Sequence, residues 1–197
     1  MFERYTEPAR RSLFFARYEA SQFGSLAIES EHMLMGVARE LGGPMGRLLA
    51  GAHCSYDEIR KEVTTRVANR EKVPTSVEIP FSSEMKRILQ HSAEEADGLD
   101  HRFIRVDHLV LAMLREQASL AAAILTEHGV KLDDARKAAT ETTSDESDVH
   151  QLRMRVSHLA FVAREIRAAL PDAESRAIIE RVIADLQALK ANLGFPE

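Results

Sequence analysis

The chain has 197 residues, 45% of them hydrophobic and 29% charged, with a formal net charge of −5, and this composition excludes disordered and collagen-like proteins. The acidic balance argues against a nucleic-acid-binding protein, and the single cysteine, Cys54, argues against a disulfide framework or a thiolate metal site. No stretch approaches the roughly 18 apolar residues of a membrane span, and no signal peptide opens the chain, so we expect a cytoplasmic protein without a membrane partner.

Four helices are predicted in residues 1–69. Thr6 is a hydroxyl N-cap ahead of a helix whose apolar residues recur every three or four positions. Ser30 is expected to cap a second helix, which the Gly-Gly-Pro run at 42–44 terminates. A short third helix follows, and a fourth begins at about Ser55. The spacing therefore predicts a compact four-helix unit.

Residues 70–80 are predicted to be an extended connector, because Pro74 and Pro80 disfavour a helix there. Residues 81–140 then repeat the first plan at one constant offset without a gap, with Ser82 in place of Thr6. Identical pairs occur in helices and loops alike: Leu13/Leu89, Glu19/Glu95, Ala20/Ala96, Ile28/Ile104, His32/His108, Arg39/Arg115 and Asp57/Asp133. We therefore predict a tandem duplication with pseudo-twofold symmetry.

Residues 141–148 are polar and acidic and predict a linker. In residues 149–197, apolar residues alternate three and four apart on either side of Pro171, which indicates two heptad helices folded back as an antiparallel hairpin. The two seams are Val149, Leu152, Val156, Leu159, Ala163, Ile166 and Leu170, and Ile179, Val182, Leu186, Leu189 and Leu193. The spacing leaves open whether this seam is buried within the hairpin, on the repeats, or against a second chain in a homodimer.

Two motifs in the duplicated region resemble a known family. They are Tyr5-Thr6-Glu7-Pro8-Ala9 with Ser30-Glu31-His32-Met33-Leu34-Met35-Gly36, and Phe81-Ser82 with Asp107-His108-Leu109-Val110-Leu111. Both are similar to the Clp N-terminal domain, the duplicated helical module of Clp-type AAA+ unfoldases, and most similar to its ClpC branch. The resemblance covers about residues 2–140. It implies an all-α fold of two tandem four-helix Clp repeats, here followed by a helical hairpin.

The chain lacks the phosphate-binding motif of an ATPase. No Gly-x-x-x-x-Gly-Lys-Ser/Thr sequence occurs, and no glycine is followed by lysine. No nucleophile elbow or metal-ligand spacing is present either. We therefore expect a free-standing Clp N-domain protein without AAA+ modules, which is not an enzyme and needs no metal or cofactor.

In the ClpC branch this domain binds substrates and adaptors and recognises phosphorylated arginine side chains. The resemblance implies two such sites, formed by Thr6, Glu7 and Pro8 with Glu31, and by Ser82, Ser83 and Glu84 with Asp107. In each site, N–H groups at a helix start would bind the phosphate and the carboxylate would bind the guanidinium. Pro8 removes one donor, and Asp107 is one methylene shorter than the glutamate of the family. The alternative is that the hydroxyls are only helix caps and the two acids only stabilise first turns.

Four aromatic residues and the repeated histidines are the remaining candidate functional residues. Phe2 and Phe81 resemble family positions beside the surface between the repeats, where peptides dock, although Phe2 could equally anchor a loose terminus. Phe14 and Phe15 are adjacent on one helix, so both cannot face the core, and one is expected to contact the hairpin or a partner. The pair His32 and His108 is interpreted as two buried histidines rather than metal ligands.

These observations predict a non-enzymatic substrate- or adaptor-recognition module of a Clp protease system, with proteins as its partners and phosphoarginine as a candidate ligand. The alternative is an assembly or regulatory accessory protein that binds Clp protease or unfoldase subunits through the repeats or the hairpin. An exposed hairpin seam together with degraded repeat sites would favour the alternative.

Overall fold

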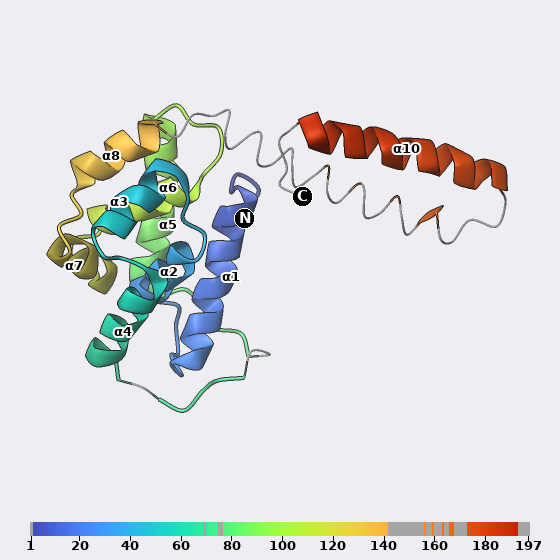
Figure 1. Cartoon of the computed structure of the whole chain (residues 1–197). Coiled ribbons are helices and arrows are strands. Elements are labelled where there is room, and N and C mark those ends of the chain that lie inside the picture. Colours follow the sequence, from blue (N-terminus) through green and yellow to red (C-terminus); the bar gives the residue numbers. More distant parts are fainter. Residues whose placement is uncertain are drawn as a thin grey trace. The chain divides into compact units, whose positions relative to one another are not determined.

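Figure 1 shows the computed structural model, which describes residues 2–68, 70–74, 77–141, 156, 159, 163, 166, 167 and 173–192. The chain separates into two compact units, Met1–Thr142 and Thr143–Glu197.

The first unit contains eight helices among its described residues: α1 (Glu7–Gln22), α2 (Ser30–Ala38), α3 (Gly43–Gly51), α4 (Tyr56–Arg66), α5 (Ser83–Gly98), α6 (Val106–Arg115), α7 (Leu120–Glu127) and α8 (Leu132–Glu141). The offset found in the sequence carries the bounds of α1 onto those of α5 and places α2, α3 and α4 almost exactly on α6, α7 and α8. The described residues form two isolated β-bridges and no sheet. The predicted all-α fold of two tandem four-helix repeats is therefore confirmed.

Two of the three predicted helix caps are present. The Thr6 hydroxyl accepts a hydrogen bond from the Ala9 N–H at 3.4 Å, and the Ser82 hydroxyl accepts one from the Met85 N–H at 3.0 Å. Ser55 caps α4 in the same way. These hydroxyls satisfy N–H groups that have no partner within the helix.

The predicted cap at Ser30 is wrong, because α2 begins at that residue and Glu29 is its N-cap. The Glu29 N–H donates to Nδ1 of His32 at 3.0 Å, which holds the helix start in place of a serine cap. The Ser30 hydroxyl contacts the Glu31 carboxylate and accepts from the Ala121 N–H of α7, each at 3.4 Å. The Gly-Gly-Pro run at 42–44 also differs from its predicted role, since Gly43 begins α3 and α2 has ended at Ala38.

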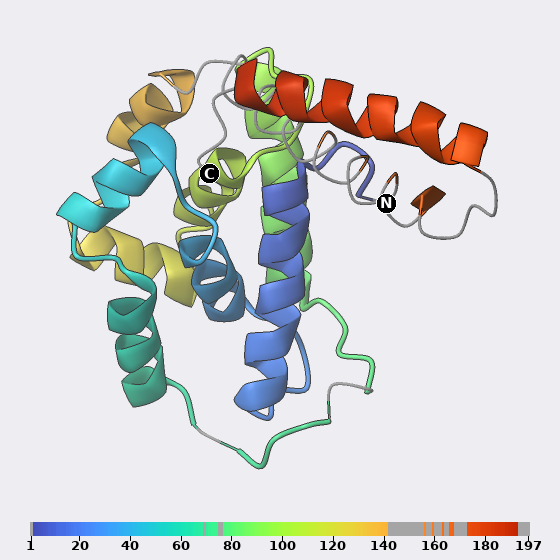
Figure 2. The ribbon, with the colours of Figure 1, turned by 45° about the vertical axis from the view of Figure 1, so that its right-hand side comes forward.

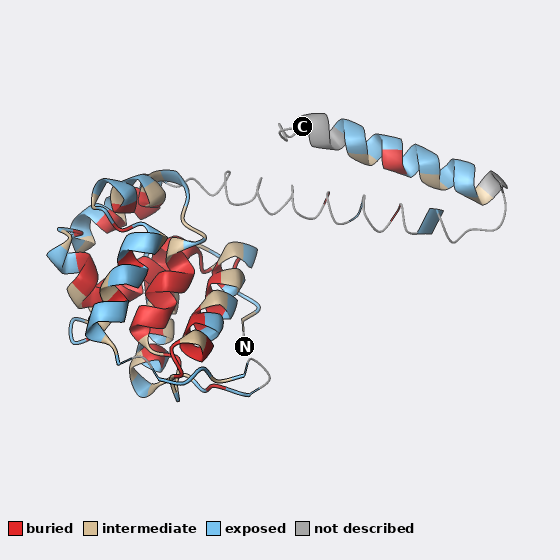
Figure 3. Cartoon of the chain, turned by 60° about the horizontal axis from the view of Figure 1, so that its bottom comes forward, coloured by how far each residue is buried: buried red, intermediate tan, exposed pale blue. Residues whose placement is uncertain are grey.

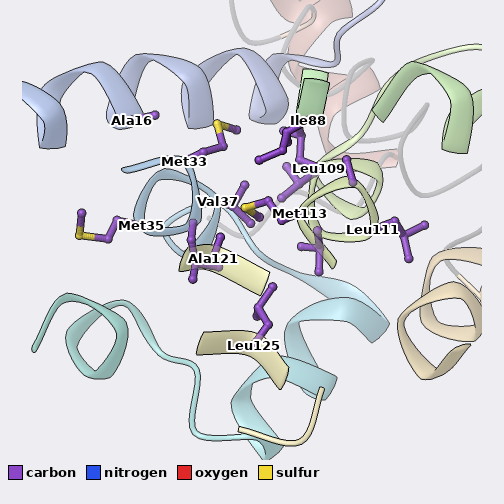
Figure 4. Packing of buried hydrophobic residues seen from close by; sticks show 14 of the residues in the cluster. Ala16, Met33, Met35, Val37, Ile88, Leu109, Leu111, Met113, Ala121 and Leu125 are labelled. Atoms are coloured by element: carbon purple, nitrogen blue, oxygen red, sulfur yellow. The ribbon is translucent and has the colours of Figure 1, made fainter. Parts of the chain in front are cut away.

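The core of the first unit is built around α2 and α6, which are buried along almost their whole length (Figure 3). Val37 of α2 and Met113 of α6 belong to one cluster of fully buried side chains, in which residues from α1, α5 and α7 also take part (Figure 4). No single described helix is long and apolar enough to cross a membrane; α6 and α7 together meet that test but are bent by 96° and lie in this core. The two repeats thus share one hydrophobic core.

Helices α1 and α2 lie antiparallel and very close together (Figure 2). A Cβ atom on Gly36 would lie 2.2 Å from the Ser12 carbonyl oxygen, so only glycine fits at this crossing. Arg11 near the start of α1 binds Glu40, just beyond the end of α2, with an Nη2–Oε2 distance of 2.6 Å. The first turn of α2 therefore lies near the far end of α1, away from Thr6.

Two β-bridges connect the helix starts of one repeat with those of the other. Residue Tyr5 forms a parallel β-bridge with Ile104, and Ile28 forms one with Phe81. The Thr6 N–H donates to the Ile104 carbonyl at 3.0 Å, and the Ser82 N–H donates to the Ile28 carbonyl at 3.1 Å. Each repeat thus places the start of its first helix beside the start of the second helix of the other repeat.

The connector between the repeats contains no helix in its described residues, 70–74 and 77–80. It is fastened to the end of α1, where the Ser21 hydroxyl donates to the Val73 carbonyl at 2.6 Å. Gly24 has a φ of +64°, and a Cβ there would meet the Glu71 carbonyl oxygen at 2.2 Å. Only glycine allows both this backbone turn and this close approach.

The second unit contains α10 (Ala173–Asn192) among its described residues. The first predicted arm is described only at residues 156, 159, 163, 166 and 167; the predicted linker beyond residue 141 and seam positions Val149, Leu152, Leu170 and Leu193 lie outside the described residues. Arg167 forms an ion pair with Glu180 at 3.4 Å, as expected if the chain folds back. Val156 and Ala163 of the first predicted seam are buried, whereas the seam residues Leu159, Ile166 and Val182 are 54%, 45% and 42% exposed. In the second arm the buried residue is Ile183, which was not a predicted seam position. The predicted seams are therefore only partly covered within this unit.

Candidate functional site

The start of α5 offers exposed backbone donors beside a carboxylate. Ser82 is half-buried and caps the helix, Ser83 is exposed, and Glu84 follows in the first turn. The hydrogen bond from Ser82 to the Ile28 carbonyl brings this helix start next to the first turn of α2, which carries Glu31. A helix start with accessible N–H groups favours an anion. We call Glu31 with Ser82, Ser83 and Glu84 the Glu31 site.

Glu31 is a buried carboxylate surrounded by other acids. Only 7% of the residue is exposed, and burial raises the pKa of its carboxyl group, with a further increase from the carboxylates of Glu29 and Glu84. The hydroxyl of Ser30 is its side-chain hydrogen-bond partner. No cationic side chain of the described residues forms an ion pair with Glu31 or lowers its pKa. Among the described residues, the charged neighbours of Glu31 are therefore acids and not cations.

Each of the two carboxylates lies beside the helix start that was predicted for the other. The sequence interpretation paired Glu31 with Thr6 and Asp107 with Ser82, and the structure shows that this pairing is wrong. Because α1 and α2 are antiparallel and the bridges cross between repeats, Glu31 lies beside the Ser82 helix start and Asp107 beside the Thr6 helix start. The better preserved carboxylate therefore meets the better preserved helix start.

The second site is closed by an arginine of the same chain. Nη2 of Arg105 lies 3.2 Å from the Asp107 carboxylate and donates to the Ala139 carbonyl of α8 at 2.8 Å. Arg105 and Asp107 are 7% and 6% exposed, and Thr6 is 3% exposed. Glu7 is exposed and forms an ion pair with Arg10, and Pro8 supplies no N–H donor. We call Asp107 with Thr6, Glu7 and Arg105 the Asp107 site.

The difference between the two sites comes from one pair of equivalent positions. The offset that pairs His32 with His108 also places Glu29 opposite Arg105, each just ahead of its candidate carboxylate. Sequence reasoning missed Arg105, although its position shortly before Asp107 was a signal that could have found it. Because Arg105 is basic and Glu29 is acidic, Asp107 has a cation beside it, whereas Glu31 has a further acid beside it.

The predicted aromatic residues fall into two groups. Phe2 and Phe81 lie together in an edge-to-face contact with ring centroids 6.3 Å apart, and both pack against the core. Phe14 and Phe15 differ in burial: Phe14 is 68% exposed, while Phe15 is partly buried and has the Arg39 guanidinium 5.1 Å from its ring centroid. The expected contact of one of them with the hairpin or a partner stays a prediction. Phe14 lines a small hollow of about 100 Å³ with Arg17, Tyr18, Ser21 and Ile79.

The repeated histidines are structural. His32 and His108 are fully buried, and burial lowers their pKa values to about 4 and about 3. Each accepts a hydrogen bond from a backbone N–H at the start of its own helix, at 3.0 and 2.9 Å. In the described part of the chain, no three metal-binding side chains are grouped together. Burial also raises the pKa of the Cys54 thiol to about 11, which leaves it unreactive.

Two further buried carboxylates were not anticipated from the sequence. Glu19 is fully buried and binds Arg39 at 2.7 Å and the Tyr56 hydroxyl at 2.7 Å. Its equivalent, Glu95, binds Arg115 at 3.2 Å and Arg136 at 2.9 Å. The repeated identities at these positions were the signal, and they reflect one ion-pair arrangement kept in both repeats. Both acids have arginine partners, in contrast to Glu31.

The profile of the family described as Clp repeat (R) N-terminal domain matches residues 4–99 and again residues 80–175. ClpC/MecB of Bacillus subtilis, a negative regulator of genetic competence, is 32% identical over 137 residues, which are 70% of this chain and 17% of that protein. Chloroplastic chaperone ClpC1 of Arabidopsis thaliana is 32% identical over 149 residues, 76% of this chain and 16% of that protein. The chain thus spans under a fifth of the length of these relatives.

Solved structures agree on the fold. The N-terminal domain of the chaperone ClpD from Arabidopsis thaliana superposes with a TM-score of 0.57 at 25% identity, covering 71% of this chain and 94% of that domain. The N-terminal domain of Hsp104 from Candida albicans gives a TM-score of 0.56 at 21% identity over 71% of this chain and 91% of that one. The region covered corresponds in extent to the duplicated helical unit.

Proposed function

The chain belongs to the Clp repeat N-terminal domain family, and from this premise we propose that it is a non-enzymatic recognition module that binds substrates or adaptors of a Clp (AAA+) protease system. Its ligand-binding element is the Glu31 site. The ligand is an arginine side chain carrying a phosphate, which combines a cation for Glu31 with an anion for the start of α5.

The un-neutralised burial of Glu31 is the observation that carries this proposal. A buried carboxylate normally has a cationic partner, because isolated charge in a protein interior costs several kcal/mol (about 3–5 for a broken pair). Glu31 has none in the described chain, whereas the equivalent Asp107 binds the guanidinium of Arg105. The Asp107 site thus supplies an internal example of the group that the Glu31 site lacks.

The phosphate end of the ligand has matching chemistry at α5. First-turn N–H groups of a helix can donate to phosphate oxygens, and the first residue of α5, Ser83, is exposed next to Ser82. A helix cap alone accounts for Ser82, but it does not account for a carboxylate that is buried among two other acids. The guanidinium of such a ligand would be the cation that Glu31 lacks, while its phosphate would be bound at the start of α5.

Calorimetric titration of the purified protein with free phosphoarginine tests this proposal. We expect saturable binding that arginine and phosphoserine do not reproduce, since each supplies only one of the two charged groups. Glu31→Gln, which keeps the shape and removes the charge, should weaken binding at least tenfold. Asp57→Asn, at an exposed acidic first-turn position of α4, is the matched control and should bind like the wild type. Equal binding by the Glu31→Gln variant would exclude this site.

A second candidate function is supported by the exposed aromatic surface of α1. Phe14 and Tyr18 are 68% and 41% exposed beside the hollow they line, as an accessory protein that binds Clp protease or unfoldase subunits would require. Binding of purified Clp subunits that is lost in Phe14→Ser and retained in Glu31→Gln would favour this function over ligand recognition.

A further inference from the structure

We propose that Arg105 is a permanent internal occupant of the Asp107 site, so that the chain carries one open ligand site instead of two. This inference rests on the proposed function for the ligand of the Glu31 site. The claim about the Asp107 site rests on its own contacts and can hold even if that ligand is wrong.

Arg105 occupies acceptors that an incoming guanidinium would use. Its Nη2 is 3.2 Å from the Asp107 carboxylate and 2.8 Å from the Ala139 carbonyl, near the C-terminal end of α8. Both acceptors suit a cation, since the carboxylate is charged and the end of a helix carries partial negative charge. A carboxylate already bound in this way has no unmet requirement for a second cation.

Displacement of Arg105 by a free ligand is strongly disfavoured. The arginine is 7% exposed, so its removal would leave a desolvated guanidinium that has lost both acceptors. An intramolecular group also competes at an effective concentration that reaches millimolar or above for short connections, and Arg105 is only two residues from Asp107. A free ligand must therefore compete with a group that is always present beside the carboxylate.

The other components of the Asp107 site agree with its closure. Thr6 is 3% exposed, its hydroxyl is bonded to the Ala9 N–H, and Pro8 lacks a donor. At the Glu31 site, Ser83 is exposed and the residue equivalent to Arg105 is Glu29, which repels rather than replaces the partner of Glu31. Two sites with common ancestry have thus become one closed and one open site.

A single open site limits how this protein can hold a partner. A chain with two open sites can bind two tagged side chains of one protein at once and gain avidity of about a hundredfold or more. One open site gives simple one-to-one binding without that gain. Valency then depends on how many copies of the chain are brought together.

Amide NMR titration with phosphoarginine tests the proposal on the full chain. We expect wild-type shifts in residues 28–31 and 83–85 only, and in Arg105→Ala a second set in residues 5–7 and 104–108, with the calorimetric stoichiometry rising from one to two. Arg102→Ala is the matched control, because it removes an exposed arginine three positions away that has no ion pair with Asp107, and it should keep one set. If Arg105→Ala does not fold, Arg105→Lys keeps the charge but loses the planar fork, and should show the second set at higher ligand concentration.

The outcomes separate this inference from the proposed function. Wild-type shifts in residues 104–108, or a folded Arg105 variant that gains no shifts there, would overturn the inference. A wild type without shifts at either site, combined with an Arg105 variant that gains them at residues 104–108, would overturn the function proposed for Glu31 and support the closure by Arg105.

Discussion

At the scale of single residues, the two repeats differ most where a carboxylate either has or lacks an internal cation. Asp107, Glu19 and Glu95 are buried and each has an arginine within 3.2 Å. Glu31 is buried to a similar extent, but its charged neighbours are the acids Glu29 and Glu84. Retained strain of this kind is typical of functional sites, where a group kept for its ligand lowers the stability of the free protein.

We therefore expect Glu31→Gln to stabilise the ligand-free protein at neutral pH. Burial raises the pKa of the Glu31 carboxyl in the folded state, so the folded form favours the proton and loses stability as pH rises through that raised pKa. The amide cannot ionise and avoids this loss. Thermal unfolding should give a higher Tm for the variant at pH 7 and a difference that disappears toward about pH 3, where Glu31 is protonated in both states.

Asp107→Asn provides the opposite case. It removes the charged partner of a buried arginine, and breaking such a pair costs about 3 kcal/mol. Its Tm should therefore fall while that of Glu31→Gln rises. A fall in the Tm of both variants would mean that the ionised carboxylate of Glu31 has a stabilising partner in the folded protein. It would remove the main support for a ligand there.

At the scale of helices, local sequence signals predicted what local interactions determine. Thr6 and Ser82 are caps because a hydroxyl and the N–H three residues later are close in sequence. The cap at Ser30 was mispredicted because His32 provides a competing acceptor for the helix start. The crossed pairing of Glu31 with Ser82 was also missed, since it depends on the bridge between Ile28 and Phe81, which lie in different repeats and leave no mark on the local pattern. Spacing finds helices and caps, whereas contacts between repeats require the packed structure.

The approach of α1 and α2 gives a prediction at this scale. Gly36→Ala should destabilise the protein by about 2–3 kcal/mol, because the added Cβ would meet the Ser12 carbonyl oxygen at 2.2 Å and the Ala16 nitrogen at 2.9 Å, both backbone atoms of α1. Gly51→Ala in α3 is the control: nothing lies within 4 Å of its Cβ, and alanine favours a helix by up to about 1 kcal/mol. Chemical denaturation measures both free energies of unfolding. Equal stability of the two variants would show that the helices can separate without cost.

At the scale of the whole molecule, the described residues of the two repeats form one hydrophobic core. The buried cluster extends from Tyr5 to Ala139 and contains residues of both repeats. The two β-bridges between the repeats and the hydrogen bond from the Ala121 N–H to the Ser30 hydroxyl join the repeats into one unit. The second unit leaves Leu159, Ile166, Ile178 and Val182 between 42% and 61% exposed, so its apolar residues are not fully covered within it.

Truncation after residue 142 separates the three arrangements that the heptad spacing left open. We expect the truncated protein to unfold within about 2 °C of the full chain, because the buried cluster from Tyr5 to Ala139 lies entirely within it, and a change of 1 kcal/mol would already shift the Tm by several degrees. A larger fall in Tm would contradict this and would show that the hairpin packs on the repeats. Light scattering then decides between the other two arrangements: a full chain of twice the monomer mass and a monomeric truncation would place the exposed seam residues in a homodimer, while equal monomers would mean that the hairpin closes on itself.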